Sequence, residues 1–336
     1  METTPWTWDE RDGGPRVRRE VDDRGWSYFH APEALDWIRD PIGLAARLLG
    51  RRPVRMQAFD IAPSPEPTRT YPRSSRPARL HTDCAFLGLP PHAQVMVCVR
   101  PARRGGESLL LDLWPVVRRI EKRDPALFAA LFEAVRHIRF GHLSHYGATL
   151  SARRGNLLCI HPPFPLEGDP VAAGFQRYID AAEPVRFTAA TGDVYVNNNH
   201  RCVHGRGGFA DPDRLFKRFL FWFAEPWSAP RDLLERAEAA GRRTAERLAD
   251  EPRWVRESLG VDVPRTSAVA HRRLAEAIRV LVDCADVDSL PGAGASEALR
   301  WCEVLLGAAL PALEEDLPPP GVRHERLLEL VAALRS

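Results

Sequence analysis

Short runs of apolar or alternating residues dominate the middle of this chain, and turn residues separate most of them. Runs of this kind are typical of β-strands. The predicted strands cover residues 54–61, 93–100, 107–114, 134–140, 156–161, 184–189, 193–198 and 216–223. Only one clear helix, around residues 125–134, interrupts them. Long repeating strand and helix units are therefore not expected, and the pattern favours an antiparallel sandwich or barrel.

The segments before the main run of strands have a different character. Residues 1–25 are charged and lack hydrophobic periodicity, so we expect a loose arm or a peripheral cap. Residues 33–50 have the pattern of two short amphipathic helices. Five prolines and four arginines in residues 62–79 argue against regular strand pairing and favour a surface lid.

Beyond residue 230 the chain changes to amphipathic helical periodicity, with Pro and Gly between the segments. The predicted fold class is therefore α+β with a mainly β core. We divide the chain into residues 1–230, which hold the arm, the lid and the β core, and a helical C-terminal region at 231–336. The pattern does not decide whether this region is a separate domain or a wall packed on the sheet.

Composition narrows the class of protein. Apolar residues make up 44% and charged residues 27%, as in ordinary soluble proteins, and the net charge of +2 provides no uniform field toward nucleic acid or membrane. No stretch approaches 18 apolar residues, and the N-terminus does not resemble an export signal. The six cysteines form no CxxC pair, so a cytoplasmic location fits best.

The sharpest local motif is His81-Thr82-Asp83, which lies just after the proline-rich segment. Side chains at i and i+2 of an extended segment point to the same face, so one imidazole and one carboxylate can converge on a single ion. An HxD pattern alone is common by chance. A metal site at this position therefore needs further ligands from elsewhere in the chain.

A second histidine motif follows about 120 residues later, in GDVYVNNNHRCVHGR. His200 and His204 both lie in the predicted turn after a strand, and His204 is preferred because it stands in the HGR string. Two histidines and one carboxylate form the facial triad of non-heme iron(II) oxygenases. Zinc is also compatible with these ligands, but it would not explain Arg214 and Arg218 on the next strand.

This arginine pair suits 2-oxoglutarate. The keto oxygen and the adjacent carboxylate of that molecule chelate iron, so its far carboxylate must be neutralised inside a pocket. A planar guanidinium does this with two parallel charge-assisted hydrogen bonds. Arginines on an apolar strand are costly to bury without a partner, which favours a bound anion, although a structural salt bridge is the alternative.

Together the motifs resemble the taurine dioxygenase and clavaminate synthase-like oxygenases, over roughly residues 54–226. The resemblance rests on HTD, on PPHAQVMVCVRPARRGGESLLLD, on GDVYVNNNHRCVHGR and on DRLFKR. It implies a double-stranded β-helix, or jelly roll, with N-terminal helices and a helical C-terminal region. The helical tail has no counterpart in this resemblance.

The resemblance also implies roles for individual residues. His81, Asp83 and His204 would bind iron(II), and Arg214, the first arginine of DRxxxR, would hold the far carboxylate of 2-oxoglutarate. Ser108 of the GGES turn would supply a hydroxyl to the same cosubstrate. Arg218 is left to the bound small molecules, either the cosubstrate or the acidic group of the substrate, or to a structural pair.

The expected protein is an iron(II), 2-oxoglutarate and O2-dependent dioxygenase. It would hydroxylate an unactivated carbon of a small amino-acid-like or natural-product substrate and release succinate and CO2. Desaturation or cyclisation by the same cofactor chemistry is an alternative, as is a non-catalytic sensor of 2-oxoglutarate or metal. The expected partner is a small molecule, with neither nucleic acid nor membrane, and the helical tail offers a docking face for a carrier protein or a second copy of the chain.

Overall fold

The computed structural model describes residues 3–63, 73–87, 89–140, 143–164 and 168–247. The chain divides into two compact units, and each is described by itself. The first unit comprises residues 1–85, 90–134 and 148–241. In the second unit, the described part contains an antiparallel pair of strands, β7 (Arg136–Phe140) and β8 (Leu143–Gly147).

A six-stranded sheet forms the larger layer of the first unit, with the order β1-β2-β12-β5-β14-β3. Its strands are β1 (Trp6–Thr7), β2 (Trp26–His30), β3 (Arg55–Ile61), β5 (Ala93–Arg100), β12 (Asp193–Asn198) and β14 (Leu215–Trp222). All neighbouring pairs are antiparallel except β1 with β2. Antiparallel pairing between strands distant in sequence is what a sandwich requires.

A four-stranded sheet forms the second layer, with the order β11-β6-β13-β4. Its strands are β4 (Ala78–His81), β6 (Ser108–Asp112), β11 (Val185–Phe187) and β13 (Cys202–Arg206). A separate hairpin pairs β9 (Leu150–Arg153) with β10 (Asn156–Cys159). Both sheets combine strands from the first and second halves of the chain, so the structure brings HTD and HGR into one sheet.

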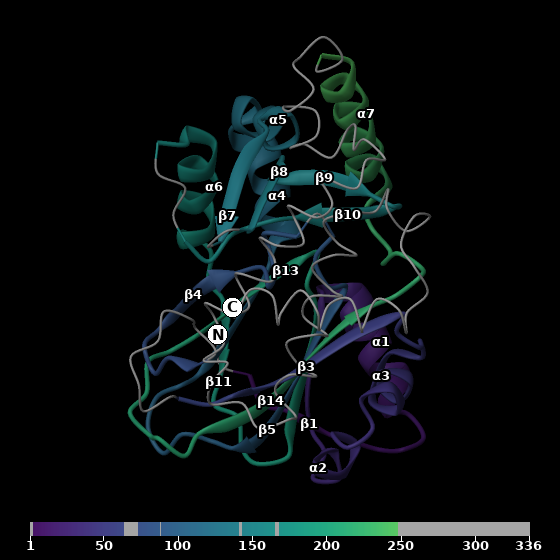
Figure 1. The fold of residues 1–336 in the computed structure, drawn as a ribbon, viewed down its shortest axis with the longest axis vertical. Coiled ribbons are helices and arrows are strands. Elements are labelled where there is room, and N and C mark those ends of the chain that lie inside the picture. The colour runs from purple at the N-terminus through teal and green to yellow at the C-terminus, as the bar shows by residue number, and fades with distance from the viewer. Residues whose placement is uncertain (1–2, 64–72, 88, 141–142, 165–167, 248–336) are drawn as a thin grey trace, which may run out of the picture. The chain divides into compact units, whose positions relative to one another are not determined.

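Three N-terminal helices cover the outer face of the larger sheet (Figure 1). They are α1 (Gly13–Arg24), α2 (Ala34–Trp37) and α3 (Pro41–Leu49). Asp40 caps α3 by accepting a hydrogen bond from the backbone N–H of Gly43, and Pro41 begins the helix, both common features of helix N-termini. Val17 and Val21 of α1 are buried in the apolar cluster under these helices.

Four further helices cover the outer face of the smaller sheet. They are α4 (Leu113–Arg123), α5 (Pro125–Glu133), α6 (Pro170–Asp180) and α7 (Arg231–Arg247). Val203 of β13 and Leu111 of β6 reach into the same apolar cluster as Leu233 and Ala237 of α7. The beginning of the predicted C-terminal region therefore packs on the first unit.

The two sheets face each other across a third apolar cluster. This interior contains Met96 and Tyr195 from the larger sheet together with Leu110 and Cys202 from the smaller sheet. Successive residues of a strand point to opposite faces, so each strand has one face toward its helices and one toward this interior. The sheets and their helical covers are thus arranged as helix, sheet, sheet, helix.

The structure corrects two expectations. Of the two alternatives for residues 1–25, the loose arm is wrong and the cap agrees with the structure, because β1 and α1 bury Trp8, Val17 and Val21 against the larger sheet. The segment 125–134 is not the only helix among the strands, since α4 begins at Leu113, inside the predicted strand 107–114, and α6 follows later. The other predicted strands coincide with observed strands to within a few residues.

Other parts of the sequence interpretation fall only partly within the described chain. The described end of the proposed lid, 73–79, runs into β4 from Ala78, whereas residues 64–72 lie outside the described ranges. Of the helical C-terminal region, residues 248–336 also lie outside them. The division at residue 230 and the docking role of the tail stay predictions.

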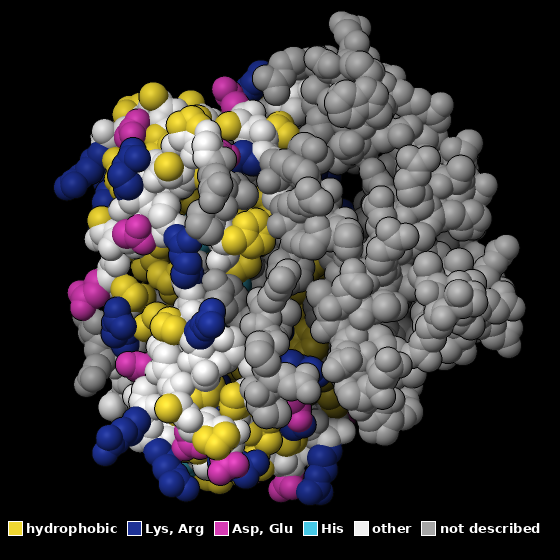
Figure 2. Space-filling view, turned by 60° about the vertical axis from the view of Figure 1, so that its left-hand side comes forward, with side chains coloured by type: hydrophobic (Ala, Val, Ile, Leu, Met, Phe, Trp, Pro, Cys, Tyr) yellow, Lys and Arg dark blue, Asp and Glu magenta, His cyan; other side chains and the backbone are white. Residues whose placement is uncertain are grey.

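The described surface carries charges of both signs. Figure 2 shows Arg and Lys side chains interspersed with Asp and Glu over the described part of the face in view, without one sign forming a continuous patch there. In the described ranges, no helix is both long enough and apolar enough to cross a membrane.

Candidate active site

His81 and His204 are brought together by the pairing of β4 with β13. The two residues are direct register partners in this antiparallel pair, and their ring centroids lie 4.4 Å apart. The register of this pair shifts between His204 and Arg206, and the extra residue lies on β4, which indicates a local bulge there. Two imidazoles that are 123 residues apart in sequence (204 − 81) therefore face the same interior space.

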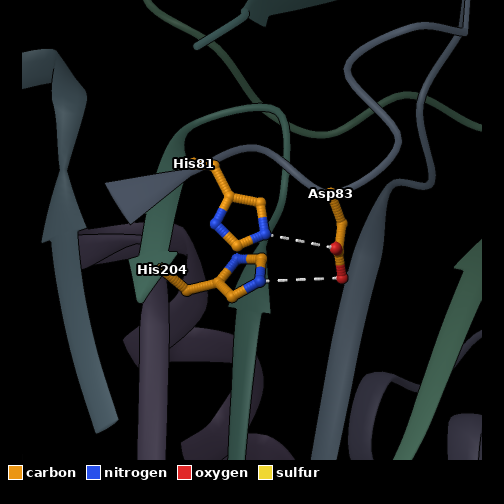
Figure 3. Close-up of side chains that lie close together, drawn as sticks. All are labelled: His81, Asp83 and His204. Carbon is orange, nitrogen blue, oxygen red and sulfur yellow. Dashed lines mark ion pairs between the residues drawn. The ribbon is translucent and has the colours of Figure 1, made fainter. Parts of the chain in front are cut away.

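Asp83 completes a cluster with these histidines (Figure 3). The Nε2 atom of His81 lies 3.6 Å from Asp83 Oδ1, and the Nε2 atom of His204 lies 3.7 Å from Asp83 Oδ2. All three residues are buried, and each offers one ligand atom within 4.8 Å of the others. Ligands about 2.1 Å from one ion lie at most about 4.2 Å apart, so both nitrogen-to-oxygen separations suit a shared metal.

The carboxylate of Asp83 has two charged or polar neighbours besides the histidines. Arg218 donates from Nη1 to both carboxylate oxygens at 3.0 Å, and Gln94 donates from Nε2 to Oδ2 at 2.5 Å. Burial by itself raises the pKa of Asp83, but Arg218, His204 and His81 outweigh it and hold that pKa well below its ordinary value. Asp83 is therefore ionised at neutral pH, as a metal ligand must be.

Asn199 fixes the backbone at Asp83. Its side-chain Oδ1 accepts a hydrogen bond from the backbone N–H of Asp83 at 2.9 Å, and its Nδ2 donates to the backbone carbonyl of Asp83 at 3.1 Å. The same Nδ2 donates to the carbonyl of Pro91. Asn199 is fully buried, so these bonds are shielded from water. The residue ties the carboxylate-bearing turn to the segment after β12.

The surroundings of the two histidines suit metal binding. His81 Nδ1 lies 2.7 Å from the carbonyl of Arg79, a contact that orients the ring with Nε2 toward Asp83. Burial lowers the pKa of His204 to about 3, so this ring is neutral at pH 7. Two imidazoles and one carboxylate are the donor set of non-heme iron(II) facial triads.

A second buried basic group, Arg214, lies beside Ser108 and Tyr195. The guanidinium carbon of Arg214 lies 4.1 Å from the ring centre of Phe216 and 4.9 Å from that of Phe209. Its Nη1 atom is buried and has no hydrogen-bond partner among the described residues. An arginine buried in this way is prepared to receive an anion.

The GGES turn makes room for this arginine. Gly106 has φ of +74°, and a Cβ atom at this position would lie 3.2 Å from Arg214 Nε. Gly105 has φ of +70°, and its Cβ would lie 2.2 Å from the carbonyl oxygen of Gly208. Both positions therefore require glycine. Ser108 follows at the start of β6, is buried, and shares a side-chain hydrogen bond with Tyr195.

The structure separates the two histidines that competed in the sequence. His204 lies in the cluster, whereas His200 is buried elsewhere, with Nε2 2.9 Å from the carbonyl of Pro90 and its ring 4.7 Å from that of His92. Arg214 and Arg218 were expected on one face of a strand. Arg214 immediately precedes β14, next to a register shift, and only Arg218 reaches Asp83.

Sequence reasoning missed two residues that contact the predicted ligands or their surroundings, Gln94 and Tyr195. Asn199 stood in a run of asparagines expected either to orient a substrate or to make the turn, and its contact with Asp83 was not expected. The inward face of Gln94 was detectable from the alternation of residues 93–100, where one polar residue interrupts an apolar strand. The role of Asn199 was not detectable, because it depends on a contact across 116 residues.

Comparison with known proteins supports the resemblance stated from the motifs. Residues 45–163 match the family model described as "Taurine catabolism dioxygenase TauD, TfdA family". This range contains His81, Asp83, Gln94 and Ser108 but ends before His204.

Solved structures with a related chain path include an asparagine oxygenase in complex with Fe(II), 2S,3S-3-hydroxyasparagine and succinate. It has a TM-score of 0.48 and 17% sequence identity, and the match covers 64% of this chain and 79% of that one. Another is the non-heme iron oxygenase OrfP in complex with Fe and alpha-ketoglutaric acid, with a TM-score of 0.46, 17% identity and coverage of 64% and 84%. Over residues 45–163, which hold His81 and Asp83 of the cluster, this chain is therefore similar to the TauD and TfdA family of dioxygenases.

Proposed function

We propose that this chain is an iron(II)- and 2-oxoglutarate-dependent dioxygenase that hydroxylates an unactivated carbon of a small, acidic, amino-acid-like substrate and releases succinate and CO2. One observation carries the proposal: a buried His81, Asp83 and His204 cluster shares the space between the sheets with a buried arginine whose Nη1 is unpaired among the described residues. A metal ligand set and an anion site in one interior are what a chelating dicarboxylate cosubstrate requires.

His81, Asp83 and His204 would hold the iron, which when bound supplies the activation of O2 for attack on a C–H bond. The protein's own residues prepare the ligands for that task. The Arg79 carbonyl orients His81, burial keeps His204 neutral, and Arg218 with Gln94 holds the Asp83 carboxylate in one orientation. Such neighbours fix the ligand atoms before the ion arrives.

Arg214 and Ser108 would hold the far carboxylate of 2-oxoglutarate. The free Nη1 of Arg214 donates to the anion, and the Ser108 hydroxyl supplies a second donor from the neighbouring sheet. Burial raises the pKa of Tyr195 to about 12, so its phenol stays protonated and does not repel the carboxylate. Apolar neighbours exclude water there, which strengthens each charged hydrogen bond.

Arg218 would serve the substrate as well as Asp83. Its Nη1 is used by Asp83, but its Nε is buried without a hydrogen-bond partner among the described residues. The remaining edge of the guanidinium is suited to a carboxylate of the substrate. This arrangement places an acidic group of the substrate directly beside the iron ligands.

The two arginines provide the test. Arg214→Ala should raise the dissociation constant of 2-oxoglutarate at least ~100-fold, because losing a buried charged partner costs about 3 to 5 kcal/mol and each 1.4 kcal/mol is a factor of ten. The measurement is calorimetric titration of 2-oxoglutarate into anaerobic, iron(II)-loaded protein. Arg214→Lys, which keeps the charge and loses the paired geometry, should show a smaller loss.

Arg218→Ala is the matched comparison, four residues further along the same chain segment. It should mainly weaken the binding of the primary substrate, and its loss of 2-oxoglutarate affinity, which arises only through Asp83, should be smaller than that of Arg214→Ala. The reverse pattern would exchange the two roles. If neither variant weakens 2-oxoglutarate binding, the cosubstrate site is assigned wrongly.

We further propose that the two facing sheets form a double-stranded β-helix, with the iron between them. The interior shared by the larger and smaller sheets supports this arrangement. The four cysteines in the described ranges are buried and free, which agrees with a cytoplasmic location. The mass of the product formed would distinguish hydroxylation from desaturation or cyclisation.

A further inference from the structure

Three amide side chains form a row across the inner face of the larger sheet. Asn197 of β12 is the register partner of Gln94 of β5, and Gln94 is the partner of Leu220 of β14. Leu220 is in turn the partner of Gln57 of β3. Their chain neighbours, among them Val95, Val196 and Phe221, belong to the outer cluster under α1 to α3, so the row faces the interior.

These amides are buried and largely without partners. Gln57 is 2% exposed, Gln94 is 1% exposed and Asn197 is fully buried. Both amide atoms of Gln57, both amide atoms of Asn197 and Oε1 of Gln94 have no hydrogen-bond partner in the described part of the chain. The other amide atom of Gln94 donates to Asp83 and to His204 Nε2.

Such a row is costly for the fold. A buried polar atom without a partner loses its bonds to water and gains nothing in return, and native structures contain few of them. Five such atoms along one line across neighbouring strands indicate a site that is completed by a group outside the described residues. The apolar Leu220 between Gln94 and Gln57 gives this site a hydrophobic floor, as is common in small-molecule sites.

The position of the row connects it to the metal ligands. Gln94 contacts Asp83 and His204 directly. Arg218 lies two residues before Leu220 on β14, in the adjacent row of the same face. A molecule lying on Leu220 would thus have the Arg218 guanidinium, which can bind an anionic group, on one side and neutral amides on the other. The row itself contains no charged side chain, so a charged group there would be buried without a counter-charge.

We propose that Gln57, Gln94 and Asn197 form the recognition site for a neutral carboxamide or peptide amide group of the substrate. This inference rests on the proposed function and adds the substrate class: an amino-acid-like molecule with an acidic end on Arg218 and an amide on the row. A primary amide is self-complementary, because its carbonyl accepts and its NH2 donates. Each free amide of the row therefore matches the same group on a ligand.

The test compares amide and acid probes of equal shape. L-Asparagine against L-aspartate, and L-glutamine against L-glutamate, are titrated into anaerobic iron(II)-loaded protein with saturating 2-oxoglutarate. The wild type should bind each amide at least ~10-fold more tightly than its acid. Gln57→Leu should remove that preference and leave the weak binding of the acid probes unchanged.

The melting temperature distinguishes a role of Gln57 in substrate recognition from a role in stabilising the fold. Because Gln57 has no hydrogen-bond partner in the described protein, Gln57→Leu should leave the melting temperature unchanged or raise it. Met56→Leu, on the opposite face of the same strand, is the control for repacking of β3 and should leave the amide preference intact. A clear loss of melting temperature in Gln57→Leu would show that the amide belongs to the fold and would overturn the proposal.

The other possible results of the titrations also decide whether the proposed amide site is correct. Equal binding of amide and acid probes, or no binding of any amide, overturns the proposal, and hydration alone then explains the row. The same titrations report 2-oxoglutarate binding independently. If 2-oxoglutarate binds while the amides do not, only the substrate class fails, whereas loss of both contradicts the proposed function.

Discussion

The two faces of β5 differ in how completely their side chains are satisfied. On the outer face, Ala93, Val95 and Val97 are fully buried against apolar residues of the helical layer. On the inner face, Gln94 alternates with them, contacts Asp83 and retains an unpaired oxygen among the described residues. The outer face is complete within the described residues, whereas the inner face retains polar atoms without a partner among them. We therefore expect outer substitutions to change stability and inner substitutions to change binding.

The largest expected effect is at the metal cluster. Asp83→Ala removes one of three ligands and leaves Arg218 without its carboxylate, so substrate-dependent succinate formation should be abolished. The measurement is succinate release together with iron(II) affinity, and circular dichroism checks that the variant is folded. A folded Asp83→Ala protein with wild-type turnover would refute the ligand assignment.

On the outer face, Phe221→Ala should lower the free energy of unfolding by about 3 to 5 kcal/mol, because it opens a cavity in a fully buried apolar cluster. Denaturant titration measures the loss. The folded variant should bind 2-oxoglutarate within about twofold of wild type. A large change in binding at preserved stability would mean that the two faces are not independent.

The buried pair His92 and His200 gives a pH dependence unrelated to catalysis. Burial lowers the pKa of His92 to about 2 and that of His200 to about 4. Below a pH of about 6.5, the ordinary pKa of histidine, these two histidines become protonated in the unfolded chain but stay neutral in the folded chain. Stability should therefore fall as pH drops, by about 2 to 4 kcal/mol between pH 7 and pH 5.

Denaturant titrations at the two pH values measure this slope. The double variant His92→Gln with His200→Gln, which cannot take up these protons, should lose most of the slope whatever its stability at pH 7. An unchanged slope in the double variant would assign the pH dependence to other groups.

The smallest expected effect concerns Asn199, which holds the backbone of Asp83 on both sides. Asn199→Ala should weaken iron(II) binding about 10- to 100-fold, as loss of residues that support metal ligands commonly does. Asn198→Ala is the matched control, because Asn198 accepts from the backbone N–H of His200 and not from Asp83. Equal losses in both variants would show a general disturbance of the segment.

The sequence predicted those parts of the fold and site that depend on local pattern. The i and i+2 spacing of His81 and Asp83 follows from extended backbone, and most strands follow from alternation. The failure to predict α1 also had a local cause. Val17 and Val21 stand at helical spacing, but the charged residues around them obscured this pattern.

Contacts between distant segments were outside the reach of pattern analysis. The register that sets His204 opposite His81 joins two strands far apart in sequence, and the pairing of Arg218 with Asp83 depends on how two sheets face each other. No spacing in a single chain encodes these distances. The missing hydrogen-bond partners of the amides in the inner row likewise become visible only in the structure.

The guanidinium of Arg214 lies over the rings of Phe209 and Phe216, and its Nη1 has no hydrogen-bond partner among the described residues. An arginine side chain carries about 2 kcal/mol of rotamer entropy, which is normally lost when it first captures an anion. Here the aromatic rings restrict the side chain as the protein folds. The loss of side-chain entropy of this arginine therefore occurs during folding and not during binding. The cosubstrate binds to a guanidinium that is already ordered.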